Sequence, residues 1–362
     1  MAKILIVRLG AMGDILHALP VVTGIRQAMP QATIDWVVEE RWSELLEVPS
    51  GARQASAASP KSEHCSGKPA LDTIHKVNTL RWRKAFWSPR TGAEVLSALQ
   101  AIRKAKYDLA LDFQGAMKSG FFTALSGART KAGFSKPRES PARFAYSQKY
   151  ETSMEHVIEQ NHELAVQALG QLGVSTLPLP APQLPRDPAG EAWAEAEIQR
   201  LGVASFAIMN PGAGWGAKQW PAQRYGQVAQ ALARHNIKTL VNTGPGEESL
   251  AQEIIGASGG NAFEVHCSIG QLISLMRRAR LFIGGDTGPL HLAASLDIPA
   301  VALYGPTDPK RTGPFGAKSV VIRHPESHTT MSHNSVPEEG LLKITADEVV
   351  SAARWLLGGG RG

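Results

Sequence analysis

The sequence predicts an α/β protein built from two doubly wound halves, each a parallel sheet flanked by helices. The chain opens with a strand-loop-helix-strand pattern over residues 3–38. In the second half, two apolar strand-like runs, 206–210 and 281–283, each end at a glycine-rich turn. A proline-rich segment, 176–189, separates the halves. Strands that alternate with helices are typical of parallel sheets, and we expect the loops after the strands to face a central cleft.

The first half is read from apolar periodicity and from helix breakers. Composition changes to Ala, Ser, Pro and Lys over 48–73, which predicts a mobile surface insertion. The segment 129–150 holds scattered basic residues without periodicity, so we expect it to be irregular. The other expected elements are strands at 3–7, 34–38 and 109–112 and helices at 15–29, 94–104, from 118 and at 156–172.

The second half of the chain shows the same alternation of expected strands and helices. Proline lacks a backbone N–H, so 176–189 cannot be a central element and is predicted to be the linker. It follows an N-terminal domain, 1–175, and precedes a C-terminal domain, 190–344, and a closing helix within 345–362. The expected strands are 205–210, 238–242, one near Phe263, 281–284 and 299–304, and the expected helices are 190–200, 222–235, 247–257, 270–279, 288–296 and 345–357.

Composition restricts the function classes. A chain of 362 residues with 43% hydrophobic and 19% charged residues is a globular protein of two domains. Cys65 and Cys267 fit no metal or disulfide pattern, and we expect neither a leader nor a membrane span, which favours a cytoplasmic protein. The net charge of +6 favours an anionic partner without choosing among nucleic acid, membrane surface and phosphorylated substrate.

Two turns in the second half have the character of phosphate sites. The run 281–283 stops at Gly284-Gly285, and Thr287 and Pro289 suit the start of a helix. Free N–H groups at a helix N-terminus bind anions, although an ordinary capped turn would have the same residues. The second turn, 211–216, matches neither the dinucleotide nor the P-loop pattern. Two such turns together suggest a bound nucleotide diphosphate.

Several motifs resemble glycosyltransferase family 9, the ADP-heptose transferases of lipopolysaccharide core assembly. They are DTGPLHLA at 286–293, YGPTDP at 304–309 and the opening MGD at 12–14 with His17 and Pro20. DWVVEE at 35–40, RWRKA at 81–85 and DFQG at 112–115 are similar to the heptosyltransferase I subfamily. Residues 48–73 and the glycine-rich loop 212–218 depart from that subfamily's pattern.

This resemblance implies the GT-B fold, two Rossmann-like domains. It implies inverting transfer of L-glycero-D-manno-heptose from ADP-heptose to the Kdo of Kdo-lipid A, with no metal and no cofactor. The protein would then be peripheral on the cytoplasmic face of the bacterial inner membrane, and it would bind no nucleic acid. Alternatives are a heptosyltransferase for a later core acceptor and, more distantly, a nucleotide-sugar epimerase or a basic nucleic-acid-binding protein.

Two residues are candidates for catalysis. Asp14 begins a helix, where it serves either as a cap or, as the family implies, as the base that takes the acceptor hydroxyl's proton. Lys218 lies between Gly216 and Trp220, and we expect it to neutralise the leaving diphosphate; the alternative is a solvated loop lysine.

The other candidates divide between donor and acceptor. Glu247 is expected to accept ribose hydroxyls or to favour a helix N-terminus. His291 is either a buried helix histidine or a phosphate or heptose contact. The donor set is Gly212, Gly214, Lys218, Glu247, Asp286, Thr287, Gly288 and His291.

The expected acceptor residues are mostly basic, because guanidinium groups bind carboxylates and phosphates bidentately. A solvated basic face is the alternative, although interleaved Trp82, Phe86 and Trp87 argue for the core or for contact with an amphiphile. The acceptor set is Arg8, Arg81, Arg83, Lys84, Gln114 and Arg138.

Overall fold

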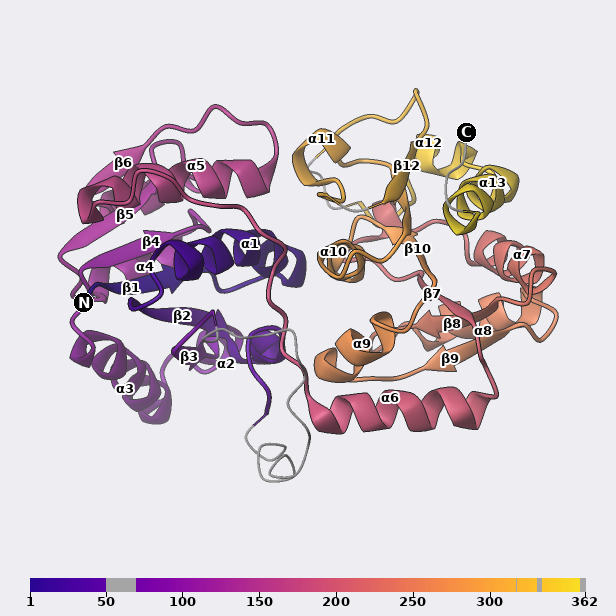
Figure 1. Ribbon diagram of the computed structural model, residues 1–362, viewed down its shortest axis with the longest axis horizontal. Helices are drawn as coiled ribbons and strands as arrows, with labels where there is room; N and C mark the ends of the chain where they lie inside the picture. The colour runs from indigo at the N-terminus through magenta and orange to yellow at the C-terminus, as the bar shows by residue number, and fades with distance from the viewer. Residues whose placement is uncertain (50–69, 317, 331–333, 359–362) are drawn as a thin grey trace. The chain divides into compact units, whose positions relative to one another are not determined.

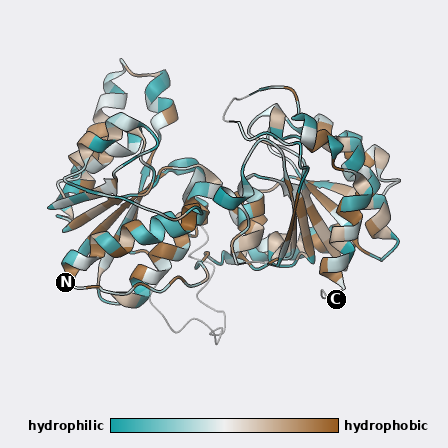
Figure 2. Ribbon diagram, turned by 90° about the horizontal axis from the view of Figure 1, so that it is seen from above, coloured by the Kyte–Doolittle hydropathy of each residue, from teal (hydrophilic) through white to brown (hydrophobic). Residues whose placement is uncertain are grey.

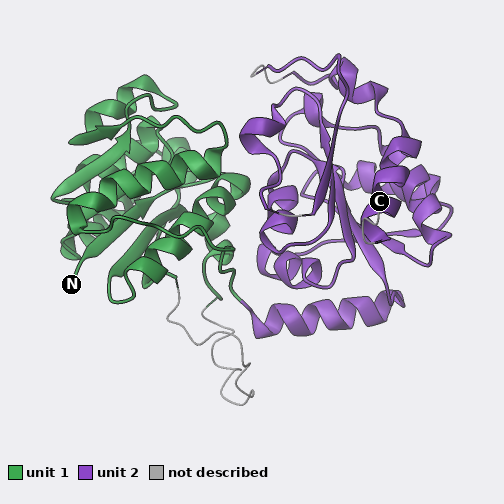
Figure 3. Ribbon diagram, turned by 45° about the horizontal axis from the view of Figure 1, so that its top comes forward, with its two compact units in different colours: residues 1–185 green, residues 186–362 purple. Residues whose placement is uncertain are grey.

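A computed structural model describes residues 1–49, 70–316, 318–330 and 334–358. The chain forms two compact units, Met1–Pro185 and Arg186–Gly362 (Figure 3). Most of the predicted insertion at 48–73 lies outside the described residues. Each unit contains a six-stranded, all-parallel sheet between layers of helices (Figure 1), so the α/β prediction is confirmed.

The sheet of the first unit has the order β3-β2-β1-β4-β5-β6. The chain starts at β1, winds outward to β3 and returns to β4 on the other side of β1, which places a topological switch point between β1 and β4. The prediction of an irregular 129–150 is wrong, because β5 and β6 lie there; they are short and polar and lack an apolar run. The strands are β1 Lys3–Val7, β2 Thr33–Glu39, β3 Thr73–Val77, β4 Leu109–Asp112, β5 Thr130–Phe134 and β6 Gln148–Tyr150.

Two helical layers cover this sheet. Helices α1 and α5 pack against each other, whereas Ile102 of α3 and Phe122 of α4 share one core cluster with Leu5 and Val7 of β1. The helices and 3-10 turns are α1 Met12–Ala28, η1 Glu40–Leu45, α2 Thr79–Lys84, α3 Pro89–Lys104, α4 Met117–Leu125, η3 Ser140–Ala145, α5 Val157–Leu169 and η4 Gly170–Leu172.

The sheet of the second unit has the order β12-β11-β10-β7-β8-β9, with its switch point between β7 and β10. Figure 2 shows the strands as the most apolar part of each unit, as expected where both faces of a parallel sheet are buried. The edge strand β12 was not predicted, because its residues are only half-buried. The strands are β7 Phe206–Asn210, β8 Lys238–Asn242, β9 Ala262–Val265, β10 Leu281–Gly285, β11 Ala300–Tyr304 and β12 Ser319–Arg323.

The closing helix belongs to the core of the second unit. Val349 and Ala353 of α13 share a buried cluster with Val228 of α7 and Ile254 of α8. No helix in the described part of the chain is long and apolar enough to cross a membrane. The helices and turns of this unit are α6 Pro188–Leu201, η5 Gly216–Lys218, α7 Ala222–Ala233, α8 Glu248–Ala257, α9 Ile269–Met276, α10 Gly288–Ser295, α11 Pro309–Thr312, α12 Glu339–Lys343 and α13 Ala346–Leu357.

Candidate active site

The switch point of the second unit brings the two predicted phosphate turns together. Strands β7 and β10 are neighbours in register, with Gly284 opposite Asn210. The turn after β7 ends at Lys218, and β10 is followed directly by Asp286. The Lys218 carbonyl lies 3.3 Å from the position a Cβ would take at Gly285, so the two turns touch.

Asp286 is the centre of a buried charged cluster. Its carboxylate accepts a hydrogen bond from Lys218 Nζ at 2.7 Å and lies 3.1 Å from His291 Nε2. The Tyr304 hydroxyl lies 3.4 Å from the same carboxylate and donates to the Thr312 carbonyl at 2.8 Å. Asp286 therefore orients Lys218 and His291 together. Tyr304 was not predicted as a site residue, although it begins the YGPTDP motif that the sequence displays.

The charge state of Asp286 follows from its partners. Burial alone would raise the pKa of this carboxyl, but the hydrogen bond and charge of His291 and the Lys218 ammonium hold its pKa well below its usual range. Asp286 is thus ionised across the physiological range, and Lys218 keeps its position beside a permanent anion. A lysine has three N–H donors, so Lys218 retains donor capacity for a ligand.

We expect Asp286→Asn to remove a pH-dependent part of the stability. A depressed folded pKa means that the unfolded state binds more protons, so this contribution is fully present above the unfolded carboxyl pKa of about 3.9 and is lost as pH falls below it. Urea unfolding at pH 7 and at about pH 2.5 should show a smaller difference in stability between parent and variant at the lower pH. A difference that grows on acidification would contradict this role.

Glu247 reaches back onto the loop that follows β7. It occupies the N-cap position of α8, yet its carboxylate accepts the Gly244 N–H at 2.8 Å and lies against Gly212. A Cβ at Gly212 would lie 2.0 Å from Oε1 of Glu247, so only glycine leaves room for the carboxylate. Behind this contact, Asn242 donates to Asn210 at 2.7 Å and joins the ends of β8 and β7. Glu247 and Lys218 therefore both lie at the carboxyl edge of the second unit's sheet.

Gly212→Ala should displace Glu247 and weaken ADP binding several-fold with little loss of fold stability, because the new methyl meets only the end of a flexible side chain. Titration calorimetry with ADP measures the affinity and thermal unfolding the stability. Gly256→Ala is the matched control, because its Cβ would enter open space on α8. Equal ADP affinities in the parent and both variants would exclude Glu247 from the donor site.

The remaining donor candidates have distinct settings. Thr287 is the N-cap residue of α10, but its hydroxyl donates to the Gly285 carbonyl at 3.3 Å and does not cap the helix. Gly288 begins α10, so its N–H belongs to the first turn, where anions bind. Gly214 is exposed at the tip of the β7 loop.

The switch point of the first unit brings together Asp14, Arg8 and Gln114. Asp14 Oδ1 forms an ion pair with Arg8 at 2.7 Å, and its Oδ2 accepts the Ala11 N–H at 3.0 Å. Arg8 is buried and also donates to the Phe113 carbonyl, while Gln114 accepts the Leu9 N–H at 2.8 Å. Asp14 thus caps the start of α1 through the Ala11 N–H. The side chain is still 32% exposed, and each carboxylate oxygen has a second lone pair, so a role as base is compatible with it.

A network that the sequence did not reveal shapes the loop that carries Gln114. Asp112, fully buried at the end of β4, accepts the N–H groups of Gln114 and Gly115 at 2.8 and 3.0 Å. Ser119 and Tyr146 donate to its other oxygen, each at 2.8 Å. Burial raises the pKa of Asp112, against the hydrogen bonds that lower it. Asp112 was visible in the DFQG motif, but no local signal links it to Tyr146, 34 residues away.

The basic acceptor candidates fall into two places. Arg138 is exposed beside the Gln114 loop, since its backbone nitrogen lies 3.1 Å from the Cβ position of Gly115. Arg81, Arg83 and Lys84 are exposed on α2, which follows β3, two strands away from β1 in the sheet. Arg81 is paired with Glu94 of α3.

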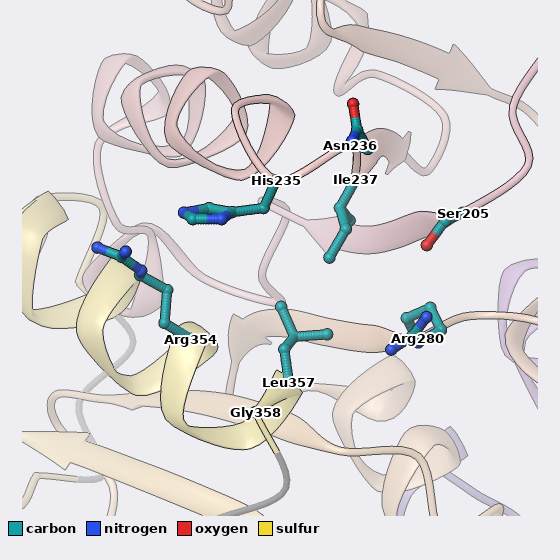
Figure 4. A pocket seen from close by; sticks show the side chains of 8 residues that line it. All are labelled: Ser205, His235, Asn236, Ile237, Arg280, Arg354, Leu357 and Gly358. Atoms are coloured by element: carbon teal, nitrogen blue, oxygen red, sulfur yellow. The ribbon is translucent and has the colours of Figure 1, made fainter.

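A cavity of about 470 Å³ in the second unit has a lining that includes neither Lys218 nor Asp286 (Figure 4). Ser205, Ile237 and Arg280 line it and directly precede β7, β8 and β10. It is therefore at the amino-terminal edge of the sheet, whereas Lys218 and Asp286 follow the carboxyl ends. Parallel α/β sheets bind ligands at their carboxyl edge, so this cavity is not the candidate site.

Two doubly wound units, each with its own parallel sheet, are the architecture of GT-B glycosyltransferases. The chain belongs to glycosyltransferase family 9, the heptosyltransferases, whose family model matches residues 95–341. The predicted family and enzyme class are confirmed.

Relatives along nearly the whole chain bear the same activity in their names. Lipopolysaccharide heptosyltransferase 1 of Pseudomonas aeruginosa is 28% identical over 88% of this chain and 82% of its own length. The protein of that name from Escherichia coli K12 is 28% identical over 90% and 95%. Among solved structures, E. coli heptosyltransferase WaaC with ADP aligns with a TM-score of 0.76 and 26% identity, covering 98% of this chain and 99% of that one.

Proposed function

We propose that this heptosyltransferase transfers L-glycero-D-manno-heptose from ADP-heptose to the Kdo of Kdo-lipid A in lipopolysaccharide inner-core biosynthesis. The names of the heptosyltransferase 1 relatives support the reaction. WaaC structures with ADP and with ADP-2-deoxy-2-fluoro heptose support the donor. The observation that carries the proposal is the Lys218–Asp286–His291 cluster at the switch point of the second unit.

In this proposal the second unit holds the donor. The diphosphate lies on the first turn of α10, with Lys218 and His291 as charge and hydrogen-bond partners. Glu247 accepts the ribose hydroxyls from the edge of β8. Asp286 acts as a positioning residue, because its carboxylate is buried and holds Lys218 and His291 in place.

The first unit supplies the acceptor site and the base. Asp14 takes the proton from the attacking Kdo hydroxyl while that oxygen forms a bond to the anomeric carbon of the heptose. The bond from this carbon to the β-phosphate breaks, and ADP leaves with the electron pair. Attack opposite the leaving group inverts the anomeric centre, by analogy with inverting glycosidases. Arg8 pairs with Asp14, and Gln114 holds the loop that leads from β1 to α1.

Side chains and N–H groups neutralise the leaving group in this scheme, so no metal and no cofactor are required. Transfer should therefore proceed unchanged in EDTA. Because the acceptor is a lipid made inside the cell, we place the protein on the cytoplasmic face of the inner membrane as a peripheral protein.

The assignment of the donor to the second unit and the acceptor to the first predicts the effect of Arg83→Ala combined with Lys84→Ala. The double variant should raise the acceptor KM about tenfold and reduce its salt dependence, because screened ionic contacts are lost. ADP affinity without acceptor should be unchanged.

Arg103→Ala with Lys104→Ala is the matched control, since it removes the same charge from the far end of α3. A fall in ADP affinity equal to the loss of acceptor use would show that α2 serves the donor.

A further inference from the structure

Residues 83–90, which comprise the turn between α2 and α3 and the adjoining helix ends, present two aromatic side chains outside the core. Trp87 is 92% exposed and Phe86 is 69% exposed, and their rings form a T-shaped pair at 5.2 Å. Trp82, one turn earlier, instead packs on the core, 6.4 Å from the ring of Phe122. The fold therefore packs Trp82 partly against the core and leaves the Phe86–Trp87 pair largely uncovered by the described residues. We call residues 83–90 the aromatic corner.

Internal contacts fix the corner in place. Glu94 of α3 accepts the indole N–H of Trp82 at 2.9 Å and is paired with Arg81, so α2 is tied to α3. Arg90 donates to the same carboxylate at 3.2 Å. The exposed aromatic pair consequently lies in a corner whose two helices are held together by the hydrogen bonds and ion pair of Glu94.

The charge around the corner is strongly positive. Residues 79–94 contain four Lys or Arg and one carboxylate, Glu94, which is already shared among three donors. Arg83 and Lys84 are exposed immediately before the aromatic pair. Such a surface attracts an extended anionic partner.

Further apolar side chains are exposed on α3 and α4, the helices that cover one face of the first unit's sheet. Helices α3 and α4 cover one core cluster and hence one face. Leu96 of α3 and Met117 and Phe121 of α4 are exposed. Three further apolar side chains are thus exposed on the two helices that cover this face.

We propose that the aromatic corner docks on an anionic lipid bilayer, with Phe86 and Trp87 in the interface and Arg83, Lys84 and Arg90 at the headgroups. Tryptophan favours the membrane interface, long basic side chains extend from apolar surface to headgroups, and aromatic plus basic residues together bind anionic lipids. The choice of lipid over protein or RNA rests on the proposed function, whose acceptor is itself a lipid.

The test is co-sedimentation of the full chain with phosphatidylcholine vesicles that contain phosphatidylglycerol and lack Kdo-lipid A. Phe86→Ser combined with Trp87→Ser should lower the partition coefficient on the order of tenfold or more, because two interfacial aromatic groups are removed. Binding of the parent should weaken with salt and be weak on pure phosphatidylcholine. Trp355→Ser is the matched control, an exposed tryptophan (53%) on α13, and it should bind like the parent. Thermal unfolding verifies that both variants fold.

Transfer to two acceptors separates docking from acceptor recognition. The corner variant should keep its kcat/KM toward a deacylated, water-soluble acceptor and lose it toward acceptor in vesicles. Unchanged vesicle binding, or an equal loss of kcat/KM with both acceptors, would overturn the proposal. If no acceptor is heptosylated but the corner still governs vesicle binding, the proposed function fails and the docking surface stands.

Discussion

Asp14→Asn should lower kcat by about 10²-fold or more, because the acceptor hydroxyl then has no carboxylate to receive its proton. The amide oxygen can still accept the Ala11 N–H, so the start of α1 should survive. Buried Arg8 loses its ionic partner, so some stability should be lost. Steady-state kinetics at saturating substrates, ADP titration and thermal unfolding measure the three effects.

The matched control for Asp14 is Glu348→Gln. Glu348 closes a capping box at the start of α13 by accepting the Thr345 N–H at 2.7 Å, so this variant removes a capping carboxylate away from the candidate site. It should leave kcat unchanged. If Asp14→Asn retains turnover within about threefold of the parent, Asp14 is a cap and not the base.

Lys218→Ala should reduce kcat/KM by about 10²–10³-fold and weaken ADP binding, because the charge that develops on the leaving diphosphate loses its counter-ion. The change also leaves Asp286 buried with a partner removed, which costs stability. Lys218→Met combined with Asp286→Asn removes both charges, so no unpaired charge is left buried. A loss of turnover in this folded double variant then reports the catalytic role and not a loss of folding.

Lys238→Ala is the control for Lys218. This lysine is the first residue of β8, at the amino-terminal edge of the sheet, and it donates a hydrogen bond to Asn261 at 2.7 Å. It should leave ADP affinity and turnover as in the parent. Normal ADP binding and turnover in a folded Lys218→Ala protein would show that Lys218 serves only to hold Asp286.

The sequence allowed the two sheets to be predicted because their central strands are buried on both faces and read as apolar runs, as in Leu281–Gly285. The edge strands β6 and β12 escaped prediction for the opposite reason: Gln148–Tyr150 is short and mostly exposed, and Ser319–Arg323 is only half-buried. Lys218 and Asp286 could be nominated from glycine turns, but their ion pair joins residues 68 apart and depends on β7 and β10 being neighbours. Tertiary contacts of this kind, like that between Asp112 and Tyr146, leave no local pattern in sequence.

The proposed function requires heptose transfer to the Kdo of a lipid acceptor, with a nucleotide site around Lys218 and a base at Asp14. Mass spectrometry of the lipid after incubation with ADP-heptose and Kdo-lipid A, in EDTA, tests it most directly. We predict a lipid heavier by one heptose residue, formed by the parent and nearly absent with Asp14→Asn and Lys218→Ala. An unmodified Kdo-lipid A, together with heptosylation of an acceptor that already carries heptose, would contradict it.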